Sequence, residues 1–177
     1  MLKEFILLLM GLVAVLAGVT DWRWRRIPNW LTVPAAVVGL TVNSAAYGWN
    51  GLKSSAAGLG LGLLLLFPFV LVRALGAGDW KFAGALGAFL GPHELLMVLA
   101  GTVMIAGVMA LALVIYKRRF RQMIRNIGRL LFALVTGHPA DPAVSLDNPE
   151  SLKVPFGVAI AAAAILFVGS RLALHVF

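Results

Sequence analysis

The sequence predicts an all-helical protein that crosses a membrane several times, and three features of its composition support this prediction. Hydrophobic residues make up 61% of the 177 residues, against roughly 45–50% in soluble domains. Charged residues make up only 12%, about half of the usual share. The mean hydropathy is +0.95. These values exclude a disordered chain, a soluble coiled coil and an ordinary soluble enzyme, and the length suggests one domain over residues 1–177.

Long apolar runs define the expected membrane spans, because a helix needs about 20 apolar residues to cross a bilayer. The first run is Leu2–Thr20. It is expected to persist as a helix rather than to be removed as a signal peptide, because Glu4 offsets Lys3 and the strong positive charge follows the run. The later runs are Trp30–Tyr47, Ser54–Leu75, the short Trp80–Gly91, His93–Tyr116 and Val154–Phe177. We therefore expect about six transmembrane helices.

The basic residues favour one orientation of these six spans. One side of the membrane would hold only Lys3, Lys53 and Arg171. The linkers on the other side would hold Arg23, Arg25, Arg26, Arg73, Lys81, Lys117, Arg118, Arg119, Arg121, Arg125, Arg129 and Lys153. Because basic residues concentrate in cytoplasmic loops, we expect these linkers in the cytoplasm and both termini outside. A count of five spans would break this pattern after the third span.

One long polar segment, about residues 117–153, is the expected cytoplasmic loop. From Lys117 to Leu134, apolar residues recur at helical spacing opposite a basic face. This pattern predicts an amphipathic helix on the anionic inner surface of the membrane. The rest, Gly137–Pro149, is rich in Pro and Asp and predicts a loop. Membrane topology explains the net charge of +8, and because no nucleic-acid-binding module accompanies that charge, nucleic acid is not an expected partner.

Two of the seven acidic residues are candidates for chemistry. Asp21 and Asp79 fall at the expected cytoplasmic boundary, at the ends of different spans, where a carboxylate is costly unless it is hydrated, paired or functional. Taken alone, Asp21 could be a hydrated helix end, and Asp79 could cap the helix that follows it. Together, two carboxylates a few ångström apart would share one proton. One member could then take a proton from a water while the other donates to a peptide carbonyl, which is the chemistry of aspartic proteases.

Three short motifs, in order along the chain, resemble those of the type IV prepilin peptidases. The motif Gly76-Ala77-Gly78-Asp79-Trp80-Lys81 matches Gly-x-Gly-Asp-x-Lys in that family. Asp21 followed by Arg26-Ile27-Pro28-Asn29 resembles the first motif of the family, and Val154-Pro155-Phe156-Gly157 resembles the start of its last helix. Presenilin-type proteases also contain Gly-x-Gly-Asp, but their first motif is Tyr-Asp, whereas Thr20 precedes Asp21 here.

The resemblance implies a membrane endopeptidase that removes the short basic leader of prepilin-like membrane proteins at the cytoplasmic face of the inner membrane. Asp21 and Asp79 would be its catalytic pair. The residues implied in the motifs or in the approach of the substrate are Gly76, Gly78, Lys81, Arg26, Pro28, Asn29, Pro155 and Gly157. Gly76 and Gly78 would let the backbone turn sharply and a substrate chain come close. Lys81 could act on Asp79 by proximity or bind an anionic lipid, and the sequence does not separate these roles.

The lack of cysteine limits the expected chemistry. Long members of that family carry paired cysteines that bind zinc, linked to N-methylation of the mature pilin, in a segment inserted where this chain has only Arg23–Pro28. The chain resembles the short branch that serves Tad/Flp-type pili, so we expect cleavage without methylation, without a metal and without a cofactor. His93-Glu94-Leu95-Leu96-Met97 lacks the second histidine of the zinc motif His-Glu-x-x-His. Gly58 and Gly62 predict close helix packing.

The expected partners are a prepilin-like substrate, the lipid bilayer and, as an open alternative, a second copy of the chain. The apolar helix of the substrate would dock against spans near the aspartate pair. Its basic leader would meet acidic residues such as Asp141, Asp147 or Glu150. Two other functions stay open: a small transporter or channel-like protein whose aspartates bind cations or protons, and an inactive structural partner in a secretion complex. Transporter sites usually lie near the middle of the membrane, and these aspartates fall at its edge.

Overall fold

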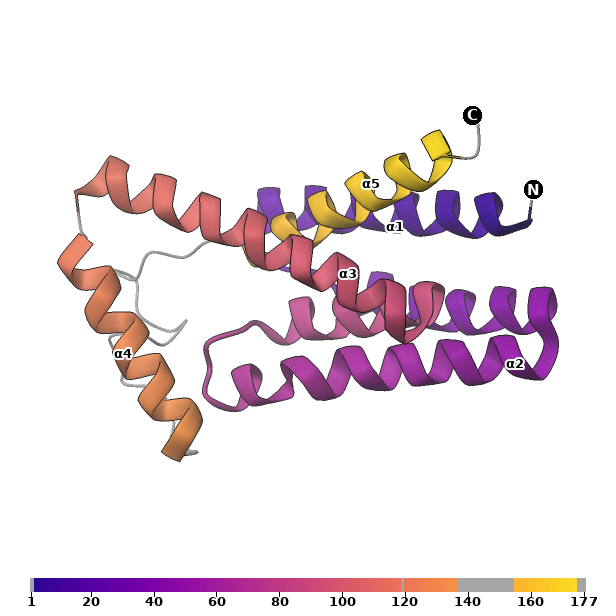
Figure 1. Ribbon diagram of the computed structural model, residues 1–177, viewed down its shortest axis with the longest axis horizontal. Helices are drawn as coiled ribbons and strands as arrows, with labels where there is room; N and C mark the ends of the chain where they lie inside the picture. The colour runs from indigo at the N-terminus through magenta and orange to yellow at the C-terminus, as the bar shows by residue number, and fades with distance from the viewer. Residues whose placement is uncertain (1, 119, 137–154, 175–177) are drawn as a thin grey trace.

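The structure, a computed structural model, describes residues 2–118, 120–136 and 155–174. All regular elements in these ranges are helices, as expected. They are α1 (Leu2–Trp24), α2 (Asn29–Leu71), α3 (Ala77–Lys117), α4 (Phe120–Thr136) and α5 (Phe156–Leu174), and Figure 1 shows all except α4 running along one common direction. The chain begins and ends at the same end of this bundle. We call this the termini end and the opposite one, where α1 ends and where α3 and α5 begin, the Asp end.

Helices α2 and α3 each double back at a glycine (Figure 1). Gly48 has φ 60° and ψ −140°, and Gly91 has φ 75° and ψ 177°. Residues other than glycine rarely adopt such positive φ values. Each helix therefore consists of two antiparallel arms, residues 29–47 and 49–71 in α2 and residues 77–90 and 92–117 in α3, and both turns lie at the termini end.

The helix count differs from the expected six spans. Within the described ranges, four helices are long and apolar enough to cross a membrane: α1, α2, α3 and residues 156–173 of α5. The expected spans Trp30–Tyr47 and Ser54–Leu75 are joined in α2, and Trp80–Gly91 and His93–Tyr116 are joined in α3. The expected spans were separate helices, but here the chain reverses at a single residue, Gly48 or Gly91, and helical structure resumes at once. The count of six is thus not supported by the helices, and the orientation stays a prediction.

Side chains from α2 stabilise the turn within α3. The Ala88 carbonyl has no helical donor, because the residue four positions later is Pro92, which lacks an N–H. Asn43 Nδ2 donates to the carbonyl oxygens of Ala88 and Phe89, each at 3.0 Å, and Ser55 Oγ donates to Ala88 at 2.7 Å. Since an unpaired buried carbonyl costs about 1–3 kcal/mol, these bonds permit the reversal inside an apolar bundle.

Small residues bring the second arm of α2 against the first arm of α3. A Cβ atom on Gly58 would collide with the carbonyl oxygen of Gly87, and one on Gly87 would collide with that of Gly58. A Cβ atom on Gly62 would lie 2.7 Å from the carbonyl oxygen of Ala83. The prediction that Gly58 and Gly62 mark close helix packing is therefore confirmed. Helices α1 and α5 approach in the same way, since a Cβ atom on Gly18 of α1 would lie 3.0 Å from the Cβ atom of Ala161 on α5.

The distribution of apolar side chains fits a membrane protein. Phe82, Met10 and Leu86 are fully buried between the helices. Large apolar side chains such as Leu64 and Met104 are also exposed on the outer faces of the apolar helices. A soluble monomer rarely exposes an extended apolar surface of this kind, and a lipid bilayer would cover it.

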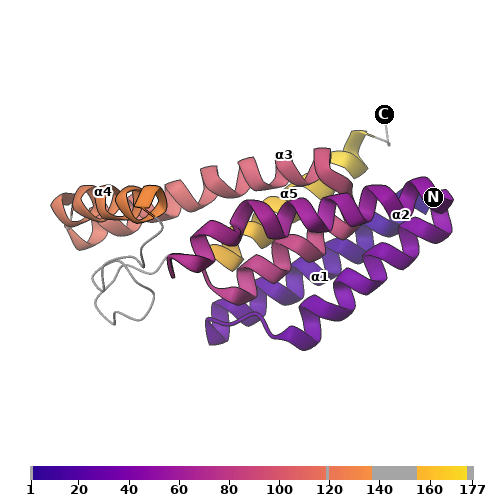
Figure 2. The same cartoon turned by 90° about the horizontal axis from the view of Figure 1, so that it is seen from below.

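Helix α4 confirms the predicted amphipathic helix, with shifted bounds. The prediction began at Lys117, but that residue ends α3, and the chain turns at Arg118 (φ 52°) before α4 begins at Phe120. Helix α4 crosses the Asp end steeply, and Figure 2 shows it nearly end-on while the bundle helices run across the view. Ile124 and Ile127 are exposed. The expected loop Gly137–Pro149, with Asp141 and Asp147, and also Glu150 and Lys153 lie outside the described residues.

Arginines with positive φ follow three helices. They are Arg25 after α1 (φ 53°), Arg73 after α2 (φ 57°) and Arg118 after α3 (φ 52°). In each case the backbone N–H returns to a carbonyl of the helix that has just ended: Asp21, Val70 and Ile115, respectively. All three helix ends lie at the Asp end (Figure 1). Glycine usually takes this conformation at helix ends.

Candidate active site

The side chain of Asp79 is positioned by the first turn of α3. The helix is capped by Gly76, and Asp79 is its third residue, so it is not itself the N-cap that the sequence allowed. The backbone N–H of Gly76 is hydrogen-bonded to the Asp79 carboxylate, and a Cβ atom on Gly76 would lie only 3.2 Å from Asp79 Oδ2. The carboxylate therefore folds back over the glycine. An acidic side chain in the first turn is also favoured by the helix dipole.

The two residues after Asp79 fix the start of α3 against α2. Trp80 Nε1 donates to the carbonyl oxygen of Leu63 at 2.6 Å. Lys81 Nζ donates to Asn29 Oδ1 at 2.9 Å, which joins the starts of α3 and α2. Lys81 and Asn29, both expected site residues, thus bind each other. This bond is a third role for Lys81, and its effect on Asp79 by proximity and its binding of an anionic lipid stay predictions. Trp80 was missed as a positioning residue, although it lies inside the motif.

Asp21 lies in the last turn of α1 and is 6% exposed. A carboxylate at this end of a helix is disfavoured by the dipole of its own helix. The N-terminus of α5 compensates, because the backbone N–H of Val158 donates to Asp21 Oδ2 at 3.0 Å and the N–H of Gly157 is also hydrogen-bonded to this carboxylate. Free N–H groups at a helix N-terminus are a favourable site for an anion.

The two carboxylates meet at Gly157. A Cβ atom on this glycine would lie 2.7 Å from Asp79 Oδ1 and 2.8 Å from Asp21 Oδ2. Both oxygens therefore border the same small space above the glycine Cα. The structure thus brings together the two aspartates and Gly157, which the sequence predicted from three separate motifs.

Ile27 is a site residue that the motifs did not single out. Its Cδ1 atom would lie 2.8 Å from a Cβ atom on Gly157. Its backbone oxygen and nitrogen would lie 2.9 and 3.2 Å from a Cβ atom on Gly78. Gly78 is therefore needed for the close approach of α3 to the linker between α1 and α2. Only the position of Ile27 inside the Arg-Ile-Pro-Asn stretch could have indicated this role.

Three further expected residues lie at the starts of helices or in the linker before α2. Pro28 precedes the first residue of α2, with φ −76° and ψ 150°. Pro155 precedes α5, and its carbonyl accepts the N–H of Ala159 at 3.2 Å. Arg26 is exposed in the linker between α1 and α2. Among the described residues, no group of three or more His, Cys, Asp or Glu side chains could hold a metal ion.

The fold and the site together define a helical membrane protein with two convergent carboxylates at one end of its bundle. The sequence profile of the type IV leader peptidase family matches residues 7–111, more than half of the chain, and the protein belongs to that family. The family implies a protease. The match includes Asp21 and Asp79 and ends before Gly157, which the structure places beside both carboxylates. Neither a curated protein nor a solved structure matches the chain significantly.

Proposed function

We propose that the protein is an aspartic endopeptidase that removes the leader peptide of prepilin-like membrane proteins. The observation that supports this most directly is the Cβ position of Gly157, which lies within 2.8 Å of an oxygen of each aspartate. Membership of the type IV leader peptidase family supports the class of substrate. Two carboxylates that border one space are suited to hold a single proton between them.

The proposed reaction is the hydrolysis of one peptide bond. The ionised aspartate takes a proton from a water, and the oxygen of that water bonds to the carbonyl carbon of the scissile bond. The protonated aspartate donates to the carbonyl oxygen. The carbon–nitrogen bond then breaks as the nitrogen takes a proton from one aspartate and one hydroxyl of the tetrahedral intermediate returns a proton to the other aspartate. The products are an amine and a carboxylic acid, and the pair again holds one proton. The mechanism needs one proton on the pair, and either Asp21 or Asp79 can carry it.

Glycines around the pair leave room for its two carboxylates. A Cβ atom on Gly76 would lie 3.2 Å from Asp79 Oδ2, and one on Gly157 would lie within 2.8 Å of an oxygen of each aspartate. Because a peptide bond inside a helix is shielded by its own hydrogen bonds, the bond to be cut must be extended.

We place the basic leader against acids of the segment outside the described residues, such as Asp141 or Glu150. Charge reversal of these acids with no change in cleavage would refute that contact.

The proposed topology places the aspartate pair at the cytoplasmic face of the inner membrane. If each arm of α2 and α3 crosses the bilayer separately, the chain crosses six times and both termini lie outside. The arginines that follow α1, α2 and α3 at the Asp end support this orientation. The steep crossing of α4 at the same end supports a position in the plane of the lipid headgroups, with its arginines near anionic lipids.

The proposed reaction is limited to cleavage. Its chemistry needs two carboxylates and a water, and neither a metal nor a cofactor takes part. The chain contains no cysteine, and the linker between α1 and α2 is only a few residues long. These features support assignment to a branch of the family that does not methylate its product.

The experiment that tests the proposed function is leader cleavage of a co-expressed prepilin-like substrate. We expect Asp21→Asn and Asp79→Asn each to reduce the cleavage rate by at least about 100-fold, since acid–base groups contribute about 10²–10⁴-fold. Glu94→Gln is the matched control, because it makes the same change from acid to amide at the termini end. All variants must reach wild-type levels in the membrane. Cleavage at the wild-type rate by either aspartate variant would refute the two-carboxylate mechanism, and ion flux in proteoliposomes would then test the transporter function.

A further inference from the structure

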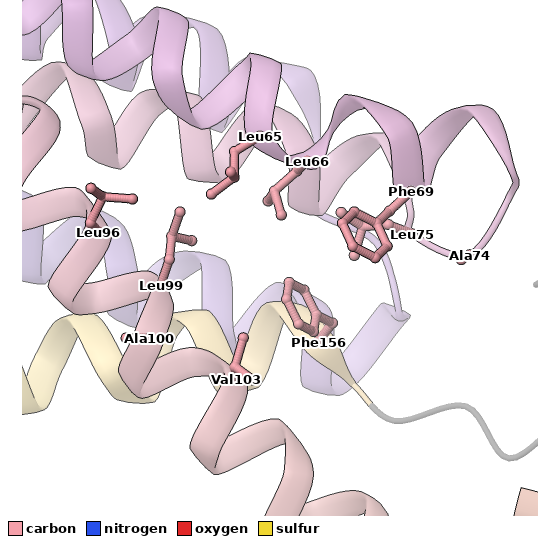
Figure 3. Close-up of a pocket in the computed structure, with 10 residues that line it drawn as sticks. All are labelled: Leu65, Leu66, Phe69, Ala74, Leu75, Leu96, Leu99, Ala100, Val103 and Phe156. Carbon is pink, nitrogen blue, oxygen red and sulfur yellow. The ribbon is translucent and has the colours of Figure 1, made fainter. Parts of the chain in front are cut away.

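An apolar groove of about 500 Å³ lies between α2, α3 and α5 (Figure 3). Leu65 and Phe69 line it from the second arm of α2, Leu99 and Val103 from the second arm of α3, and Phe156 from the start of α5. Every lining residue is apolar. The volume is within the range of sites that bind small molecules or side chains.

The groove adjoins the aspartate pair at two points along the chain. Phe156 lines the groove, and the next residue, Gly157, borders both carboxylates. Leu75 also lines the groove, and the next residue, Gly76, contacts Asp79. The groove and the carboxylate pair are therefore bordered by neighbouring residues at the start of α5 and just before α3, so a substrate chain bound at the pair lies beside the groove.

The groove has a buried floor and an open rim. Leu99 is 6% exposed and Leu75 is 9% exposed, whereas Val103 is 66% exposed. The labelled side chains in Figure 3 extend from Phe156 and Leu75 toward Leu96, which is close to the turn at the termini end. The groove therefore runs along the bundle, from the Asp end toward the interior of the membrane. An apolar chain inserted in the bilayer can enter it from the side.

We propose that this groove binds the apolar residues that directly follow the scissile bond of the substrate, so that their size and shape help to select the bond that is cut. This inference rests on the proposed peptidase function. Lipid tails are as apolar as leucine, so moving an apolar side chain from lipid into the groove gains little from the hydrophobic effect. Selection must come from close packing, which depends on shape. The groove therefore distinguishes large from small apolar residues rather than apolar from polar ones.

Cross-linking tests the occupant of the groove without requiring cleavage. The chain contains no cysteine, so Val103→Cys introduces a single thiol at the rim of the groove. Met104→Cys is the matched control, because Met104 is the next residue on α3, is 74% exposed and does not line the groove. Both variants also carry Asp21→Asn and Asp79→Asn. The substrate carries one cysteine within the first apolar turn after the scissile bond.

We expect Val103→Cys to form a disulfide with this substrate at least about tenfold faster than Met104→Cys, in line with the discrimination an apolar pocket provides. Equal rates at the two positions would overturn the proposal and leave lipid as the occupant. Disulfide-linked dimers of Val103→Cys without substrate would also overturn it, because a second copy of the chain would then cover the groove. A selective cross-link to a substrate that the wild-type protein fails to cleave would refute the proposed function but support the groove.

Filling the groove tests its effect on cleavage. We expect Val103→Trp to slow cleavage of a substrate with large apolar residues after the bond by roughly tenfold, and to slow a substrate with alanine there much less. Met104→Trp should change neither rate by more than about twofold, because surface substitutions away from a binding site have small effects. Equal losses for both substrates would show that Val103→Trp acts by general disruption and would overturn size selection.

Discussion

Carboxylates lie at both ends of the helical bundle, but their partners differ. At the termini end, Glu94 accepts from Arg171 Nη2 at 3.2 Å and from Lys3 Nζ at 3.5 Å. At the Asp end, Asp21 is bound by backbone N–H groups of α5 and shares a small space with Asp79. An ion pair neutralises charge and joins α1, α3 and α5. Two carboxylates side by side repel each other when both are charged. This arrangement persists only where the surrounding structure holds it in place, as in sites that move protons.

Among the variants proposed to test this difference, Gly157→Ala should disturb the aspartate pair most strongly. The added carbon would lie 2.7 and 2.8 Å from the two aspartate oxygens, so the carboxylates or the start of α5 must shift. A misplacement of about 1 Å can cost on the order of 100-fold in rate, and we expect at least that loss in leader cleavage. Gly169→Ala on the same helix is the control, because nothing lies within 4 Å of its added carbon. If the two variants cleave equally well, the pair does not require this spacing.

Loss of the bond between Lys81 and Asn29 should have a smaller effect. Lys81→Met removes the donor and Asn29→Ala removes the acceptor of a 2.9 Å hydrogen bond that joins the starts of α3 and α2. Because both side chains are outside the pair, we expect roughly a tenfold slower cleavage from misplacement of Asp79. The double variant should be no slower than either single one. Losses that multiply in the double variant would show that the two residues act independently.

Glu94→Gln should change stability but not chemistry. Its carboxylate forms ion pairs with Arg171 and Lys3 at the termini end, and its side chain is 18% exposed. We expect a loss of about 1 kcal/mol in the free energy of unfolding, near the upper end for exposed ion pairs. Thermal unfolding of the purified protein in detergent would measure this loss. Cleavage should stay within about twofold of wild type. A large drop in cleavage with unchanged stability would assign Glu94 a part in the reaction.

The smallest expected effect is a difference in membrane depth between two positions on α4, which tests whether this helix lies on the membrane surface. Single cysteines at Ile127 and Asn126 can carry a nitroxide label, because the chain has none of its own. Accessibility to oxygen and to a polar nickel complex should place the label at Ile127 deeper in vesicles than the label at Asn126. Each arginine near anionic lipid is worth about 1 kcal/mol, so the difference should fall when anionic lipid is omitted. Equal depths would show that α4 does not lie on the membrane.

Much of the fold was predictable because its cause is local. The apolar runs, the amphipathic pattern of α4 and the small residues of the α2 and α3 interface follow from composition and helical spacing. Six alternating spans implied that the chain reverses near residues 48 and 91. That each reversal takes a single glycine and that helical structure resumes at once was not predicted, because each depends on a backbone conformation and, at Gly91, on distant side chains such as Asn43. Glycine and proline alone indicate a break without showing that helical structure resumes at once.

The candidate site divides in the same way. Asp21, Asp79 and Gly157 were found from motifs, since each motif is a short contiguous stretch of sequence. The partner of Lys81 and the contact of Ile27 with Gly78 were not found, because residues far apart in sequence make these contacts and leave no periodic signal. The structure adds these cross-helix contacts to a pair of carboxylates that the sequence had already indicated.

The arginines with positive φ at the ends of α1, α2 and α3 have a consequence for biosynthesis. A non-glycine residue in this conformation costs roughly 1–2 kcal/mol, and glycine at Arg25, Arg73 or Arg118 would relieve that strain. The same change would remove a positive charge, and positive charges resist translocation during insertion. Arg25 acts electrostatically on the Asp21 carboxylate and Arg73 makes a further interaction, so Arg118 is the position where the two effects separate. On the proposed topology, Arg118→Gly should relax the folded backbone while increasing the fraction of newly made chains that insert upside down. At this position, the yield of correctly inserted protein and the stability of the finished protein should respond to mutation in opposite directions.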